Sequence, residues 1–112
     1  MQISVNGIEY VEKASIDEKY VIVRADRAGV FAGELVSREG DVVVLRNARR
    51  AWYWEGAASL SQLAMEGTKS PDKCKFPCPV SVITLFGVIE IINVTPAARA
   101  SIESVPVWEV SE

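Results

Sequence analysis

Apolar and polar residues in the first half of the chain alternate with the period of two that is typical of β-strands. Asn6-Gly7 favours a two-residue turn, so residues 1–12 are predicted to form a hairpin. Runs of β-branched and aromatic residues then predict strands at 20–23, with Arg24 at its end, 29–36 and 42–45. Gly33 lies inside the second of these strands, where glycine marks a bulge or the close approach of a ligand or another backbone.

Capping signals predict two short helices in the second half of the chain. A capping box begins at Ser59 and Gly67 supplies a helix stop, so a helix of about two turns is expected between them. Thr95, followed by a proline, predicts the start of a second helix that turns Ile102 and Val105 inward.

The remaining segments complete an α+β domain. They are predicted as a surface loop at 68–79, a core-crossing segment at 80–94 that is one bent strand or two strands kinked at Gly87, and a short edge strand at 106–110. The fold class is therefore α+β, a mostly antiparallel β-sheet with two short helices in a single domain spanning 1–112. Exposed edge strands need covering, which favours an oligomer.

The composition is that of an ordinary folded domain with no general affinity for polymeric nucleic acid. Of the 112 residues, 49% are hydrophobic and 24% are charged, close to the values of soluble globular proteins. The net charge of -3 disfavours general nucleic-acid binding, which rests on many Lys and Arg against phosphates. Without a signal-peptide pattern, or an apolar run of the roughly 18 residues that span a bilayer, we expect an intracellular protein that does not enter membranes.

Residue types that carry catalysis or bind metals are scarce. The chain has no histidine, which removes the commonest general base and the commonest nitrogen ligand. Its carboxylates show no spacing that singles out an acid–base pair. Cys74 and Cys78 could supply half of a zinc site shared between chains, although two ordinary free thiols are the simpler interpretation. We therefore expect no catalytic activity, no bound metal and no cofactor.

The stretch 47–63, NARRAWYWEGAASLSQL, is the strongest candidate for a binding site. If the strand that begins at 42 continued to 54, its two faces would carry Arg50, Trp52 and Trp54 on one side, and Asn47, Arg49 and Tyr53 on the other. Indole rings stack on nucleobases and guanidinium groups bind phosphates, so the first face suits a nucleotide. The alternative is that the tryptophans serve the core or an interface, each covered by an arginine.

The chain also resembles the phage anti-Thoeris sponge family, the first type described, over about residues 20–108. The resemblance rests on the segments YVIVRADRAGVFAGEL, NARRAWYWEGAASLSQLAMEG, CKFP and IEIINVTPAARASIESVPVW. It implies a non-enzymatic binder that sequesters a cyclic ADP-ribose isomer, the signal of bacterial TIR defence proteins, in the cytoplasm of the infected bacterial host. It further implies a homodimer or a hexamer built from dimers, with recessed pockets at subunit contacts, and some relatives hold cyclic oligonucleotides at a separate site.

Ten residues in the matching motifs are candidate ligand contacts. Phosphate and ribose contacts are assigned to Arg24, Arg27, Arg49, Arg50 and Arg99, base stacking to Phe31, Trp52 and Trp54, and the reading of polar edges to Asn47 and Gln62. Neighbouring residues of a strand point to opposite faces, so of Arg49 and Arg50 the second is favoured, with the tryptophans. Two other classes stay open: a protein-interaction module that uses the same Arg/Trp face, and an enzyme that degrades the signal.

Overall fold

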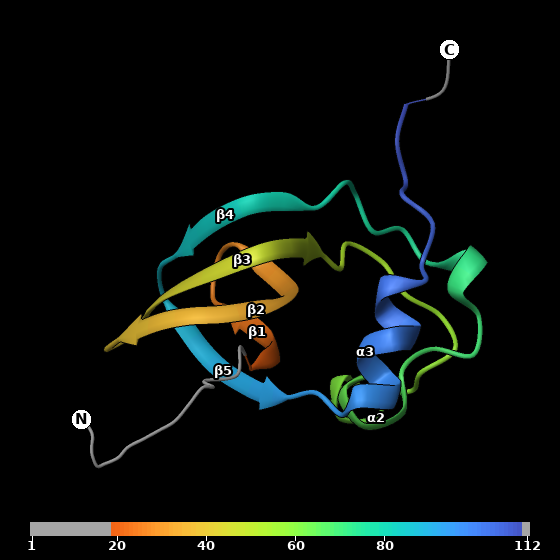
Figure 1. Ribbon diagram of the computed structural model, residues 1–112, viewed down its shortest axis with the longest axis horizontal. Helices are drawn as coiled ribbons and strands as arrows, with labels where there is room; N and C mark the ends of the chain where they lie inside the picture. Colours follow the sequence, from red (N-terminus) through yellow and green to blue (C-terminus); the bar gives the residue numbers. More distant parts are fainter. Residues whose placement is uncertain (1–18, 111–112) are drawn as a thin grey trace.

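The computed structural model describes residues 19–110, in which an antiparallel sheet lies beside two helices (Figure 1). The elements are the strands β1 (Tyr20–Ala25), β2 (Gly29–Glu39) and β3 (Val42–Arg50), the helix α2 (Leu60–Glu66), the 3-10 helix η1 (Pro71–Lys73), the strands β4 (Val80–Leu85) and β5 (Val88–Asn93), and the helix α3 (Pro96–Glu103). The strands pair in the order β4-β3-β2-β1-β5, and every neighbouring pair is antiparallel. The predicted α+β fold class is confirmed.

The sheet is strongly curled (Figure 1). β4 and β5 form its two edges, and since they are consecutive in the sequence, the short turn between them brings the edges together. Gly87, with a φ of 70°, permits the tight turn between them. The amide of Asp26 donates to the Gly87 carbonyl at 2.8 Å, and the amide of Val88 donates to the Asp41 carbonyl at 3.0 Å. These bonds tie three turns together, so the sheet forms a partly open barrel.

Strand β1 is buried on both faces and contributes to two separate cores. Val21 and Val23 pack inside the curled sheet. Tyr20 and Ile22 face the helices and belong to a second core, whose largest fully buried side chains from other elements are Leu63, Phe76 and Ile102. The alternation along β1 therefore fixes which side of the sheet the helices cover.

A bulge at Gly33 bends β2 where it pairs with β3. The register between the two strands shifts between Ala32 and Glu34. A Cβ atom on Gly33 would lie 3.1 Å from the carbonyl oxygen of Arg46, so a side chain there would push the strands apart. This confirms the bulge expected from the glycine, and on the facing strand Asn47 adopts a φ of 52°.

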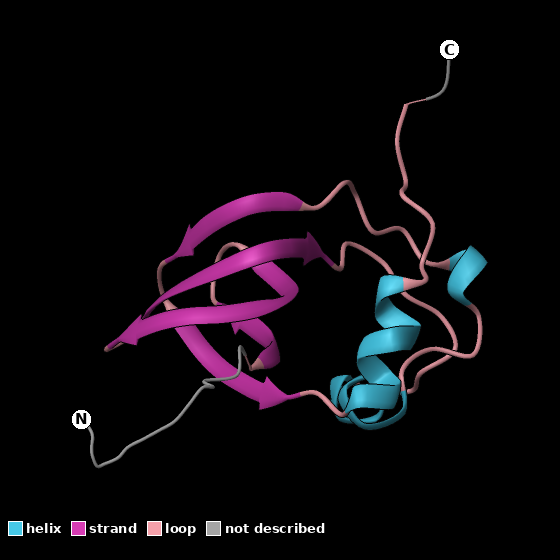
Figure 2. Cartoon of the chain, viewed as in Figure 1, coloured by secondary structure: helices cyan, strands magenta, loops and turns pink. Residues whose placement is uncertain are grey.

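Both predicted helices are present and begin at the predicted caps. The hydroxyl of Ser59 accepts an amide of the first turn of α2 at 3.1 Å, and the hydroxyl of Thr95 does the same for α3 at 3.1 Å. Gly67 ends α2 with a φ of 78°. Ile102 and Val105 are buried as predicted, and the two helices pack together at one end of the sheet (Figure 2).

Strand boundaries differ from the sequence-based ones where pairing with a neighbour decides them. The first strand extends through Arg24 to Ala25, the second to Glu39 and the third to Arg50, because each keeps an antiparallel partner over that length. The third strand does not continue to Trp54, so the alternation assumed for the tryptophans was wrong.

Three expectations for the second half of the chain also need correction. The loop 68–79 is not wholly a surface segment, since Cys74 and Phe76 are buried in it. The segment 80–94 does form two strands around Gly87, but they are the sheet edges and β4 is mostly exposed. Residues 106–110 form no strand and contribute a single bridge, between Val107 and Phe76. The hairpin expected at 1–12 lies outside the described residues.

No helix within residues 19–110 is long and apolar enough to cross a membrane.

Candidate functional site

Arg50 does not share a face with the tryptophans. Its guanidinium lies 4.3 Å from the centroid of the Phe31 ring and its Nη1 donates to the Ala28 carbonyl at 2.6 Å. Trp52 instead stacks on Trp108, and Trp54 packs against the core beneath the helices. The predicted Arg50, Trp52 and Trp54 face is therefore not formed, because the chain leaves the sheet after Arg50.

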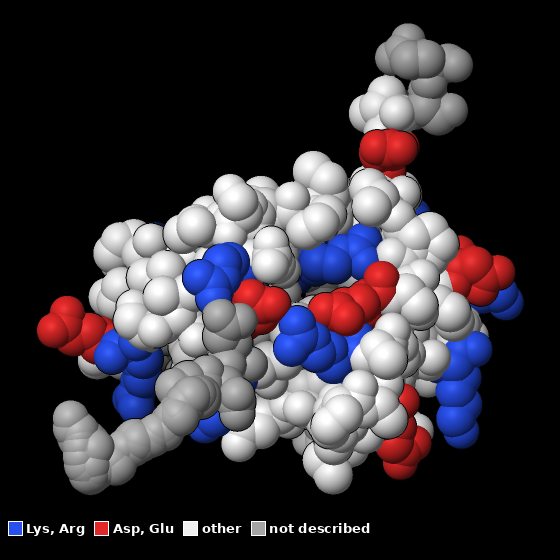
Figure 3. Space-filling model, viewed as in Figure 1, with Lys and Arg blue, Asp and Glu red and all other residues white. Residues whose placement is uncertain are grey.

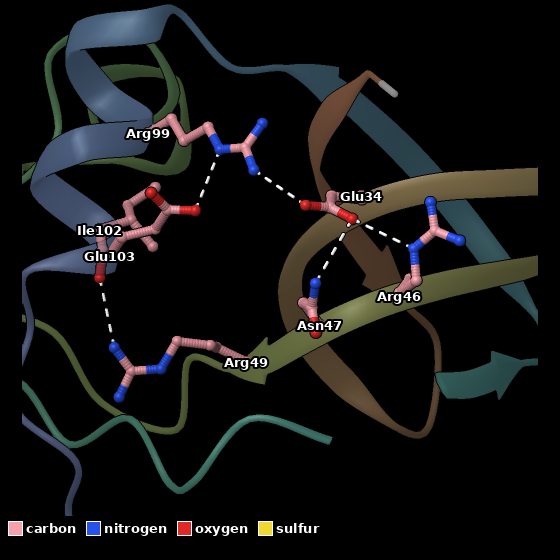
Figure 4. Close-up of polar contacts among 7 residues, drawn as sticks. All are labelled: Glu34, Arg46, Asn47, Arg49, Arg99, Ile102 and Glu103. Atoms are coloured by element: carbon pink, nitrogen blue, oxygen red, sulfur yellow. Dashed lines mark hydrogen bonds and ion pairs between the residues drawn. The ribbon is translucent and has the colours of Figure 1, made fainter. Parts of the chain in front are cut away.

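Arg49 is a buried structural anchor, only 6% exposed. Its guanidinium donates to the carbonyls of Val105 at 2.7 Å, Phe76 at 3.0 Å and Ile102 at 3.3 Å, and so joins β3 to the end of α3 and to the 74–77 segment. Figure 4 shows the bond to Ile102. The Nε atom is shielded from solvent and has no hydrogen-bond partner within residues 19–110. Burial of the charge lowers the pKa of Arg49 below its usual range.

Glu34 is the hub of a charged network between β2, β3 and α3 (Figure 4). It accepts hydrogen bonds from Arg99 at 2.9 Å, from Arg46 at 3.2 Å and from Asn47 at 3.4 Å. Arg99 also pairs with Glu103, one turn along α3, at 3.0 Å. Burial opposes ionisation of Glu34, but the hydrogen bonds from its three partners outweigh it and hold the pKa of its carboxyl below the ordinary value.

A charged hollow of about 290 Å³ opens beside this network. Its lining residues are Tyr20, Glu34, Asn47, Arg49, Pro79, Glu103, Val105 and Val107. Figure 3 shows acidic and basic side chains gathered there, between the sheet and α3. Arg99 covers the Tyr20 ring at 4.6 Å, and burial, the main cause, raises the pKa of Tyr20 to about 12. Of the predicted contacts, Asn47 and Arg49 thus line the hollow, and Arg99 contacts its lining residues Tyr20 and Glu34.

A second cluster is the aromatic plate, which we define as Trp52, Tyr53, Lys75 and Trp108. The two indoles stack with their ring centroids 5.1 Å apart and their planes 16° apart. The Lys75 ammonium lies 5.5 Å from the Trp52 ring, 5.7 Å from the Tyr53 ring and 5.6 Å from the Trp108 ring. Trp52 is 59% exposed and Trp108 is 45% exposed, so much of each indole faces solvent.

Backbone hydrogen bonds hold the plate in place. Tyr53 and Lys75 exchange bonds, with the Lys75 amide donating at 2.7 Å and the Tyr53 amide at 3.3 Å. The Trp108 amide donates to the Phe76 carbonyl at 3.0 Å, and that same carbonyl accepts from Arg49. The plate is therefore built from three segments that are distant in sequence. Arg49 is bonded to one of them through the Phe76 carbonyl.

The other predicted contacts lie elsewhere. Arg24 forms an exposed ion pair with Glu90 of β5 at 2.9 Å. Arg27 lines a separate hollow of about 430 Å³ at the β4–β5 turn. Phe31 is buried in the barrel core, and Gln62 serves the cap of α2, where its Oε1 accepts the amide of Ala58 at 2.7 Å.

Sequence reasoning missed Lys75 and Trp108 of the plate and Glu34 of the hollow. The sequence feature that could have indicated this site is Trp108 itself, a tryptophan in a segment predicted to be a solvent-facing edge strand. Both cysteines are free thiols, and the described part of the chain contains no group of three or more Cys, Asp or Glu residues placed to hold a metal ion.

The fold and these two clusters define a small antiparallel α+β domain with a polar hollow and an exposed aromatic surface. A family model described as "Domain of unknown function (DUF6948)" matches residues 18–102, so the chain belongs to that family. No curated protein and no solved structure matches the chain.

Proposed function

We propose that the protein binds a cyclic nucleotide immune signal and sequesters it without degrading it, which would block a Thoeris-type bacterial defence from within the infected cell. Glycocyclic ADP-ribose is the first candidate ligand and a cyclic oligonucleotide the second. The observation that carries the proposal is that Asn47 and Arg49 line the charged hollow, while Arg99 covers the ring of Tyr20 and pairs with Glu34, two of its lining residues. The resemblance suggests the ligand class, and the charged hollow is the proposed binding site.

The charges around the hollow suit a pyrophosphate. Two guanidinium groups, those of Arg46 and Arg99, pair with two carboxylates, those of Glu34 and Glu103. The guanidinium of Arg49 lines the same hollow but is bonded to three backbone carbonyls. Arg99 is about one-third exposed, and both its ion-pair partners, Glu34 and Glu103, are carboxylates that line the hollow. A phosphate presents the same charge and the same hydrogen-bond geometry, so it can replace the exposed Glu103 as the partner of Arg99. Asn47 adds both a donor and an acceptor for ribose hydroxyls.

The size of the hollow agrees with a pocket shared between two copies. About 290 Å³ lies at the lower limit of small-molecule sites, which span roughly 300–1,000 Å³. Sequestration at nanomolar affinity requires about -12 kcal/mol, and small ligands are bound in pockets that bury most of their surface. A homodimer, or a hexamer of dimers, would close the ligand between two such surfaces, as the resemblance implies.

The test is ligand-induced stabilisation of the purified protein. Glycocyclic ADP-ribose isomers, cyclic dinucleotides and cyclic trinucleotides are compared with linear ADP-ribose in thermal-shift assays. A ligand present at about 100 times its Kd adds about 2.7 kcal/mol, which raises Tm by roughly 10–20 °C. Arg99→Gln should weaken binding at least 30-fold, whereas the charge-matched control Arg38→Gln, on the exposed end of β2, should leave it unchanged. No shift with any cyclic nucleotide would reject the proposal.

Chemical recovery separates sequestration from degradation. The complex is denatured by heat and the released ligand is compared with the input by mass spectrometry. A sponge returns the ligand intact and in stoichiometric amount, whereas an enzyme that degrades the signal returns products.

A protein-interaction module is the second candidate, favoured by the exposed indoles of Trp52 and Trp108. Tryptophan is enriched among interface hot spots, and exposed pairs of this kind are uncommon on monomers. Size-exclusion chromatography with light scattering, at several protein concentrations, reports whether Trp52→Ala changes the oligomeric state.

A further inference from the structure

The aromatic plate exposes two indole rings to solvent. Trp52 and Trp108 each use one ring face for the other, and their exposed fractions of 59% and 45% leave the outer part of the stack open to water. The stack is preorganised, because the backbone bonds of Tyr53, Lys75 and Trp108 hold the three segments together. A ligand that extends the stack therefore finds the rings already in position.

Lys75 gives the plate its chemical preference. Its ammonium lies 5.5 to 5.7 Å from three ring centroids. Lysine is depleted in the cores of protein–protein interfaces, so a lysine at the centre of the plate argues against a protein partner. A cation beside stacked rings instead complements a ligand that combines a flat ring with a negative charge.

We propose that the aromatic plate is a stacking site for the purine base of a nucleotide, whose phosphate is held by Lys75. The proposal shares the nucleotide class with the proposed function and does not require the ligand to be cyclic or to be sequestered. A hollow of about 280 Å³ lies against Trp108 and is also lined by Glu109. The Glu109 carboxylate can accept a hydrogen bond from an exocyclic amino group, which favours adenine over hypoxanthine.

The experiment uses intrinsic fluorescence. The chain has three tryptophans, so in a Trp54→Phe background all tryptophan emission, excited selectively over tyrosine, comes from the plate. This protein is titrated with AMP, adenosine, IMP and ribose 5-phosphate. We expect saturable quenching by AMP, weaker binding of adenosine and of IMP, and no binding of ribose 5-phosphate, which has no ring to stack.

Two substitutions separate the ring contribution from the charge contribution. Trp108→Ala should weaken AMP binding by about 5- to 150-fold, the range measured for loss of one stacked base. Lys75→Gln should reduce the affinity for AMP to that for adenosine and leave adenosine binding unchanged. Lys73→Gln, an exposed lysine two residues away, is the charge-matched control and should bind AMP as the parent does. Circular dichroism of each variant verifies that the fold is retained.

Three results would overturn the inference. Quenching by AMP that stays linear and matches that of free N-acetyltryptophanamide would show collision without a site. Equal binding of ribose 5-phosphate would place the ligand away from the rings. A tryptophan emission intensity that changes with protein concentration but not with added nucleotide would show that the plate is an interface between copies of the protein. Saturable AMP binding with no response to any cyclic nucleotide would keep this site and reject the proposed sponge, so the two failures are distinguishable.

Discussion

Replacing Arg49 by methionine tests whether this residue is a structural anchor or a ligand contact. In the folded protein its guanidinium donates to the carbonyls of Phe76, Ile102 and Val105. After the substitution the Phe76 and Ile102 carbonyls keep a backbone donor each, from Trp108 and Val105 respectively. The Val105 carbonyl keeps no donor among residues 19–110, so one buried acceptor is orphaned.

The magnitude follows from opposing terms. Hydrogen bonds from a charged donor contribute about 1.5–3 kcal/mol each, and an orphaned buried carbonyl costs about 1–3 kcal/mol more. Against this, removing a buried guanidinium, whose Nε has no partner, recovers a desolvation penalty of several kcal/mol. Three bonds outweigh one penalty, so we expect Arg49→Met to lower the free energy of unfolding by about 2–4 kcal/mol. Arg49→Lys should cost at least as much, because an ammonium keeps the desolvation penalty and cannot fork onto three carbonyls.

Urea unfolding followed by far-ultraviolet circular dichroism measures this loss. Arg50→Met is the matched control, since Arg50 is the neighbouring arginine, is exposed, and donates to one carbonyl, that of Ala28. It should cost no more than about 1.5 kcal/mol. A free energy of unfolding for Arg49→Met within about 0.5 kcal/mol of the parent would refute the anchor assignment. Loss of ligand binding with unchanged stability would instead make Arg49 a ligand contact, as first predicted.

Three further substitutions test the network, a glycine and a cap. The pKa of Glu34 is lowered in the folded protein, so its contribution to stability is present above its ordinary pKa of 4.5 and is lost as the pH falls through the folded value. Glu34→Gln should therefore flatten the fall of the urea midpoint as the pH is lowered below 4.5. Gly56→Ala should lower the free energy of unfolding by more than about 2 kcal/mol in the same assay, because φ is 86° and the added Cβ would lie 2.5 Å from the amide nitrogen of Ser70. Ser59→Ala removes the cap of α2 and should cost about 1 kcal/mol, a fall in Tm of roughly 4–8 °C by calorimetry.

The helices could be predicted from the sequence because their signals are local. Ser59 and Thr95 each accept an amide within the following turn, and Gly67 ends α2 within the same short segment. Caps of this kind need no knowledge of the rest of the chain. The strands could be located for the same reason, from alternation, but their ends could not.

Strand ends depend on the partner strand, and this is where the site prediction failed. The pairing of Phe31 with Arg50 is the last in the register between β2 and β3, and the amide of Ala51 adds one more bond, to the Val30 carbonyl at 2.9 Å. Beyond this point the chain leaves β2 and Tyr53 pairs with Lys75 instead, so the alternation of β3 is not maintained. The alternating pattern of Arg50, Trp52 and Trp54 continues past the end of the strand. The shared face predicted for these three residues therefore does not exist in the folded chain.

The two clusters could not be predicted because both join residues that are remote in the sequence. Glu34 reads as an ordinary carboxylate of a strand, and its role depends on Arg99, which α3 brings across the hollow. The stacking of Trp52 on Trp108 likewise depends on how the chain returns after α3. Trp52 was a candidate from the sequence, but its grouping with Trp108 depends on the topology.

The hollow and the aromatic plate both depend on the hydrogen bonds of Arg49, so its role differs from the one predicted from the sequence. Val107 lines the hollow and the next residue, Trp108, belongs to the plate, so both depend on the position of the segment that follows α3. Arg49 fixes that segment at the Val105 carbonyl and fixes its neighbour at the Phe76 carbonyl, which also accepts the Trp108 amide. A residue selected as a phosphate contact is therefore better described as a positioning residue for both surfaces. Its guanidinium carries five N–H donors in a planar fork, which lets one side chain join three carbonyls at that point.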